Sequence, residues 1–248
     1  MFHKVLLGAL IPLLGTSVGS SVAFASNKKI KRGTTAILSG FASGVMVAAS
    51  VWSLLLPSIE FSDFGRFSFI EPCLGLLIGL LMMICSERIF DKLTSENNRE
   101  NMLYFAVTLH NIPEGMAIGA AYSAYVCSGD DALGVSAFLL SFGIAIQNIP
   151  EGAIVSLPYN TDKSKTKTFF YGVMSGVVEP FAVIITVLLS KILVPVLPFM
   201  LSFAAGAMIF VVLKELIPDF SEESQFKNGV ISFFLGFMIM MSLDVALG

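Results

Sequence analysis

Charged residues are scarce in this chain, and their scarcity excludes a soluble globular protein. They make up 13% of the 248 residues, whereas soluble domains contain about 25%. Hydrophobic residues reach 55%, and the mean hydropathy is +0.83. We therefore expect a membrane protein that has the lipid bilayer as a partner and has no nucleic-acid partner.

Cysteine and histidine are rare as well. The three cysteines, Cys73, Cys85 and Cys127, form no Cys-x-x-Cys pair, so they indicate neither a disulfide framework nor a thiolate metal site. The only two histidines are His3 and His110. A histidine that lies inside a polar motif is therefore unusual in this chain.

Long apolar runs dominate what remains. A membrane-spanning helix needs about 20 residues, and eight runs of suitable length cover residues 5–26, 34–57, 72–89, 102–125, 132–157, 168–193, 196–217 and 230–247. We expect an all-α polytopic membrane protein with eight transmembrane helices, formed as a single domain over residues 1–248.

The first run has an alternative interpretation as a cleaved signal peptide. The residues 23–25 read Ala-Phe-Ala and are similar to a signal-peptidase site. The basic residues that follow at once, Lys28, Lys29, Lys31 and Arg32, would then remain outside the cell, against the positive-inside tendency. This conflict favours a retained first span.

Basic residues also predict the orientation of the chain. With the N-terminus outside, three of the fifteen Lys and Arg residues lie on the outer side: Lys4, Arg66 and Lys191. The inner side holds twelve: Lys28, Lys29, Lys31, Arg32, Arg88, Lys92, Arg99, Lys163, Lys165, Lys167, Lys214 and Lys227. By the positive-inside rule, we expect a multi-pass protein of the plasma membrane, such as a bacterial inner membrane, with both termini extracytoplasmic.

Two nearly identical polar hexamers interrupt the fourth and fifth runs. Residues 110–115 read HNIPEG and residues 147–152 read QNIPEG, 37 positions apart. A single Asn-x-Pro is also compatible with a simple kink, and a single intramembrane Glu with a structural hydrogen bond. Polar groups are costly in lipid and usually functional, so the repetition favours a site.

Helical geometry indicates the chemistry of this site. Successive residues turn by about 100°, which places Glu114 between His110 and Asn111 on one helix face. Glu151 has the same place in the second hexamer. Each carboxylate can therefore bridge two neighbouring positions, and the mixture of imidazole, carboxylate and amide groups suits a divalent cation such as zinc, iron or manganese.

A second repeat surrounds the hexamers. Residues 41–46 (FASGVM) return as residues 203–208 (FAAGAM), and a proline follows each, Pro57 and Pro218. The two runs cross the membrane in opposite directions under the predicted orientation. Small-residue motifs also recur by chance in packed helices, but inverted repeats around a midplane site are typical of secondary transporters.

These motifs, together with Glu179-Pro180 and residues 8–19 (GALIPLLGTSVG), resemble the ZIP (Zrt-, Irt-like) divalent metal transporters, in particular their prokaryotic GufA-like branch. The resemblance covers the whole chain. It implies a 3+2+3 helix arrangement with inverted repeats, a homodimer, and uptake of divalent metal into the cytoplasm. Zinc is the expected substrate, with iron, manganese or cadmium as alternatives.

The resemblance also implies a two-metal site between spans two, four, five and six. One metal position would be held by Met46, His110, Glu114, Gln147 and Glu151. The other would be held by Asn111, Glu114, Asn148, Glu151 and Glu179. Many family members have His where this chain has Gln147, so strict zinc selectivity is in question. Glu215 is a candidate for the exit path or an interfacial charge beside Lys214.

Two other functions compete with transport. An intramembrane metal-dependent hydrolase needs an open metal position and a general base, but the chain contains no HExxH motif. A membrane metal sensor without flux would need a soluble output domain. The eight apolar runs and their short connections contain no such domain. We therefore expect no catalytic residues and no organic cofactor.

Overall fold

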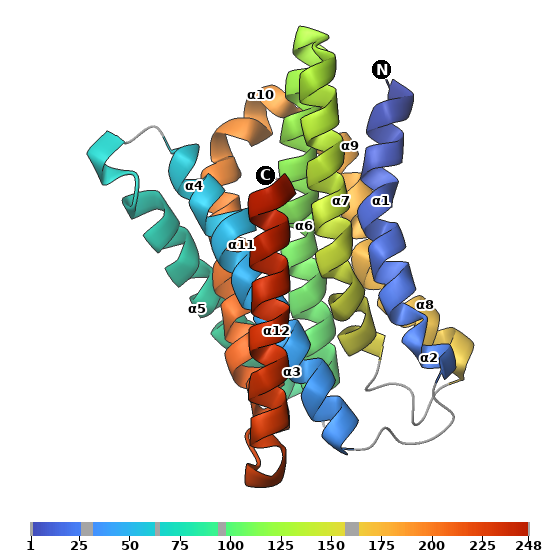
Figure 1. Ribbon diagram of the computed structural model, residues 1–248. Helices are drawn as coiled ribbons and strands as arrows, with labels where there is room; N and C mark the ends of the chain where they lie inside the picture. The colour runs from blue at the N-terminus through green and yellow to red at the C-terminus, as the bar shows by residue number, and fades with distance from the viewer. Residues whose placement is uncertain (1, 26–31, 63–64, 94–97, 157–163, 248) are drawn as a thin grey trace.

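The computed structural model describes residues 2–25, 32–62, 65–93, 98–156 and 164–247, which form a bundle of roughly parallel and antiparallel helices (Figure 1). The first three membrane-length segments are α1 (Phe2–Ser20) with α2 (Val22–Ala25), α3 (Arg32–Ala49) continued by η1 (Ser50–Leu55) and α4 (Leu56–Glu60), and α5 (Ile70–Leu93), which follows η2 (Gly65–Phe67). The central two are α6 (Asn98–Ser128) and α7 (Asp131–Ser156).

The last three segments complete the 3+2+3 order. They are α8 (Lys165–Gly176) with α9 (Val178–Leu188) and α10 (Ser190–Leu193), then η4 (Val194–Val196) with α11 (Leu197–Val211), η5 (Val212–Leu216) and η6 (Ile217–Phe220), and finally α12 (Glu223–Leu247). Each expected span coincides with one of these segments. The largest shift is at α12, which begins seven residues before the predicted Val230.

Seven segments of the described chain are long and apolar enough to cross a membrane, which confirms a polytopic membrane protein. The segment that fails this measure is α6, the helix of the first hexamer. Its apolar run is interrupted by buried polar residues, and it lies against α7, α9 and α11 rather than alone in lipid. The polarity of α6 is therefore tolerated because other helices enclose it.

Both chain termini lie at one end of the bundle, which we call the terminal end (Figure 1). The opposite end, where α3 begins at Arg32 and α8 at Lys165, is called the basic end. The turn between α6 and α7 is at the terminal end and contains Gly129, whose φ of 71° explains the glycine there. Residues 26–31 and 157–163, which include Lys28, Lys29, Lys31 and Lys163, lie outside the described residues.

Glycines set the closest helix contacts, and they occur at matching positions in the two halves. A Cβ atom on Gly44 of α3 would lie 2.0 Å from the carbonyl oxygen of Phe233 in α12, and one on Gly206 of α11 would lie 2.3 Å from that of Leu76 in α5. Both glycines come from the repeated FAxGxM motif. The same two helix pairs are joined a second time by Gly236 against Phe41 (2.1 Å) and Gly79 against Phe203 (2.2 Å).

The remaining helices repeat this relationship. Gly152 of the second hexamer approaches the carbonyl oxygen of Thr16 in α1, and Gly115 of the first approaches that of Glu179 in α9, with 2.2 Å and 2.6 Å to an added Cβ. Span one therefore corresponds to span six, two to seven, three to eight, and four to five. Because α1 packs along α7 in this way, it is an integral part of the bundle.

Each FAxGxM helix also changes its winding at the same place. The π-helical segments η1 and η5 begin at Ser50 and Val212, four residues after Met46 and Met208. By contrast, α6 and α7 remain α-helical through Pro113 and Pro150. Short π segments often mark functional positions, and the sequence pattern did not predict them.

We expect Gly44→Ala to destabilise the protein, because its new methyl group would collide with the α12 backbone. Overpacking of this kind costs about 1–3 kcal/mol, or an unfolding temperature lower by roughly 5 °C, measured on purified protein in detergent. Gly33→Ala is the matched control, since an added Cβ there meets only the side-chain oxygen of Gln225, at 3.2 Å. Equal unfolding temperatures for the two variants would contradict the assigned packing.

Candidate metal centre

The polar side chains of both hexamers are buried in the middle of the bundle. Their exposed fractions are at most 1%: His110, Asn111, Glu114, Gln147, Asn148 and Glu151. The two helices that carry them, α6 and α7, run in opposite directions side by side. The two motifs therefore face each other from opposite sides of one interior region.

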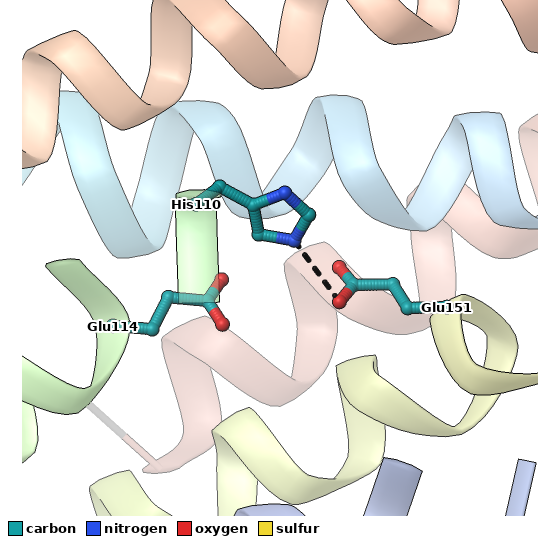
Figure 2. A group of neighbouring side chains, drawn as sticks. All are labelled: His110, Glu114 and Glu151. Carbon is teal, nitrogen blue, oxygen red and sulfur yellow. Dashed lines mark hydrogen bonds and ion pairs between the residues drawn. The ribbon is translucent and has the colours of Figure 1, made fainter. Parts of the chain in front are cut away.

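Three ionisable side chains meet in this region (Figure 2). Ligand atoms of His110, Glu114 and Glu151 all lie within 4.8 Å of one another. Nε2 of His110 lies 3.1 Å from Oε2 of Glu151. One imidazole and two carboxylates at this spacing can hold a transition-metal ion.

The hexamers are paired crosswise. The first residue of each motif contacts the glutamate of the other: His110 meets Glu151, and Nε2 of Gln147 donates a hydrogen bond of 2.5 Å to Oε1 of Glu114. The helical wheel predicts each glutamate beside the first residue of its own motif, and ligand atoms of His110 and Glu114 lie within 4.8 Å of each other. It could not predict that the hydrogen bonds would cross between the helices.

The two asparagines are tied to the outer helices through their amide nitrogens. Nδ2 of Asn148 donates to both carboxylate oxygens of Glu179, at 2.8 and 3.0 Å, and lies 3.4 Å from the carbonyl oxygen of Pro12. Nδ2 of Asn111 donates to the carbonyl oxygen of Ser175 at 3.1 Å. Pro12 and Ser175 stand four residues before Thr16 and Glu179, so these contacts also obey the inverted repeat.

Buried oxygen atoms without a hydrogen-bond partner are concentrated at this place. Among the described residues, seven buried side-chain atoms lack a partner, and five belong to the hexamers: Asn111 Oδ1, Glu114 Oε2, Gln147 Oε1, Asn148 Oδ1 and Glu151 Oε1. Leaving such an atom unsatisfied costs about 1–3 kcal/mol. A divalent cation coordinated by these oxygens would remove that cost, so the donor set fits a metal.

Glu179 joins this region through a break in span six. The segment divides at Val177 into α8 and α9, and Glu179 lies in the first turn of α9, fully buried. A helix N-terminus favours a negative charge, which helps to keep a carboxylate in this apolar setting. The structure thus brings Glu179 to Asn148, as the second predicted metal position requires.

Two predicted residues belong to the FAxGxM segments rather than to the hexamers. Met46 is 1% exposed and belongs to the apolar core cluster that also contains Met208. Glu215 is 7% exposed and lies in η5, towards the basic end. Lys214 beside it is ion-paired with Glu87, so burial of Glu215 argues against the simple interfacial charge.

Sequence reasoning missed a carboxylate near the terminal end. Oγ of Ser53 in η1 donates a 2.7 Å hydrogen bond to Oδ1 of Asp244 in α12, and Oδ2 of Asp244 has no partner. Both residues line a cavity of about 300 Å³ between η1, α4, α7 and α12, which Glu60 also lines. The signal that could have found Asp244 is its place eight residues after Gly236, on the helix that packs against FASGVM.

Comparison with known proteins identifies the family. Residues 85–244 match the family model described as ZIP zinc transporter. The chain is 32% identical to zinc transporter ZIP11 of Xenopus tropicalis, over 98% of this chain and 97% of the relative. It is also 32% identical to zinc transporter ZIPB of Bordetella bronchiseptica, over 98% and 81% of the two chains, and 29% identical to zinc transporter GufA of Myxococcus xanthus, over 98% and 94%. The chain therefore belongs to the ZIP zinc transporter family, whose members are transporters and not enzymes.

Proposed function

We propose that the protein carries zinc across the membrane through the buried hexamer region. The observation that carries this proposal is the group of five partnerless oxygens beside the His110, Glu114 and Glu151 cluster. The zinc transporters to which the chain is similar support zinc as the substrate. Iron, manganese and cadmium are the alternative substrates.

Two metal ions are held in this region in our proposal. Glu114 and Glu151 each engage one oxygen in a crosswise hydrogen bond and keep a second oxygen without a partner, which suits a bridging role. One position uses Met46, His110, Glu114, Gln147 and Glu151. The other uses Asn111, Glu114, Asn148, Glu151 and Glu179. On binding, the metals replace the hydrogen bonds that now join these side chains.

The pathway runs between the two ends of the bundle in this proposal. Ions enter from the cavity lined by Asp244 at the terminal end, pass the hexamers, and leave past Glu215 at the basic end. By the positive-inside rule the basic end faces the cytoplasm, and both termini lie outside it. Flux from the terminal end to the basic end is therefore uptake into the cell. The eight segments of residues 1–248 act as one domain in the plasma membrane, and two copies form a homodimer.

We expect Glu114→Gln to reduce zinc uptake into proteoliposomes to the level of empty vesicles. The substitution keeps the side-chain volume but removes a charge proposed to contact both metals, and no neighbouring carboxylate can take its place. Glu223→Gln makes the same change on an exposed first turn of α12 and serves as the control. Normal uptake by folded Glu114→Gln protein would show that Glu114 holds no metal.

Gln147→His is expected to raise the affinity for zinc relative to manganese by roughly tenfold, because imidazole suits zinc better than an amide oxygen does. Competition binding of the two metals to purified protein measures the ratio. Gln225→His, at a half-buried position in the first turn of α12, would control for adding a histidine. If the zinc-to-manganese ratio stays at its original value, Gln147 is not a ligand.

Cysteine labelling tests the orientation. After Cys73, Cys85 and Cys127 are replaced by serine, Ser128→Cys at the terminal end should react with an impermeant thiol reagent in intact cells. Ser164→Cys at the basic end should react only after the cells are opened. Both positions are exposed, so accessibility depends on the side of the membrane. The opposite pattern would reverse the assigned direction of transport.

A further inference from the structure

The inverted repeat assigns a counterpart to Asp244 at the other end of the pathway. Gly236 and Gly79 make equivalent contacts with Phe41 and Phe203. Asp244 lies eight residues after Gly236, and Glu87 lies eight residues after Gly79. Glu87, near the basic end of α5, is therefore the counterpart of Asp244, near the terminal end of α12.

The π segments that face these carboxylates correspond in the same way. Ser53 of η1 and Glu215 of η5 each lie seven residues after the methionine of their FAxGxM motif. Trp52 and Lys214 occupy the preceding positions. The repeat therefore places an aromatic side chain at the terminal end where the basic end has a lysine.

This difference changes what each carboxylate does. At the terminal end, Asp244 receives one hydrogen bond from Ser53, and its second oxygen has no partner. At the basic end, the ammonium group of Lys214 forms an ion pair with Glu87 and lies 5.6 Å from the centre of the Phe210 ring. Both members of the pair are about one-third exposed, at 35% and 30%. Among the described residues, Asp244 thus has a hydroxyl as its partner, whereas Glu87 has a cation.

The ion pair also sets the position of a positive charge beside the buried Glu215. Neighbouring residues on a helical segment point in different directions. Leu213 is exposed and Lys214 is half-buried, whereas Glu215 is only 7% exposed. Glu87 holds the ammonium group on the α5 side of η5. A divalent ion at Glu215 would still be repelled by this charge, because Coulomb repulsion scales with both charges.

We propose that Lys214 is a built-in counter-cation that occupies Glu87, so that the basic end of the pathway holds divalent metal more weakly than the terminal end. This inference rests on the proposed transport of zinc. It assigns Lys214 and Glu87 a role in release of the substrate rather than in the central site. In a passive carrier, the metal gradient alone sets the direction of net flux. The difference in metal affinity between the two ends therefore changes KM and the maximal rate together, without changing that direction.

The test measures zinc flux from each face separately, in right-side-out and inside-out membrane vesicles that contain a zinc-sensitive dye. Lys214→Gln is expected to lower KM from the basic end by roughly three- to tenfold, since it removes one nearby positive charge and frees a carboxylate. KM from the terminal end should stay within about twofold of the wild-type value, because the change is at the other end.

Further variants separate the ion pair from a general effect of charge. Glu87→Gln should raise KM from the basic end, since it removes the carboxylate that holds Lys214. The double variant Lys214→Gln/Glu87→Gln should lose the gain of Lys214→Gln, and Lys214→Arg should resemble the wild type. Lys227→Gln removes an exposed charge at the same end of the bundle and is the matched control. If Lys214→Gln and Lys227→Gln have the same KM from the basic end, the inference is wrong.

A binding measurement distinguishes this inference from the proposed function. In purified protein that carries Glu114→Ala and Glu151→Ala, the central site is disabled, and adding Lys214→Gln should strengthen residual zinc binding in a manner abolished by Glu87→Gln. This result does not depend on flux. Absence of zinc flux in the wild type would refute the proposed function, whereas unchanged residual binding after Lys214→Gln would refute only the role of Lys214.

Discussion

The structure depends on burying two polar hexamers inside an apolar bundle. Five of their side-chain oxygens have no hydrogen-bond partner. Each costs desolvation free energy that no hydrogen bond from the surrounding protein offsets. The helices can enclose these groups because glycines let backbones approach within contact distance, as at Gly115 and Gly152. Close packing thus fixes a set of oxygens that a bound ligand would satisfy. A cation is the ligand that matches their charge.

An inverted repeat builds this region, and a few substitutions break its symmetry. His110 and Gln147 occupy equivalent positions, so the pair offers one ring nitrogen and one amide. Thr16 and Glu179 are also equivalent, which puts a third carboxylate on one side only. Because the backbone frame is the same on both sides, the asymmetry within each proposed metal position comes from side chains alone.

The two ends of the bundle differ in the same manner. Each FAxGxM helix widens into a π segment that faces a carboxylate, Asp244 at one end and Glu87 at the other. The π segments turn their side chains away from the regular α-helical phase, which brings Ser53 within hydrogen-bond distance of α12. A shared backbone design therefore carries a carboxylate bonded to a serine hydroxyl at one end and an ion pair at the other.

The sequence by itself determined the membrane class, the eight spans, the paired hexamers and the family, because hydropathy, spacing and motif identity are properties of a linear chain. It also predicted that each glutamate shares a helix face with the first residue of its own hexamer, since the helical period is fixed. Only the tertiary structure decided that His110 pairs with Glu151 and Gln147 with Glu114, that Asp244 meets Ser53, and that Lys214 meets Glu87. These partners lie on different helices, and the register between helices depends on glycine contacts that no single-helix pattern contains.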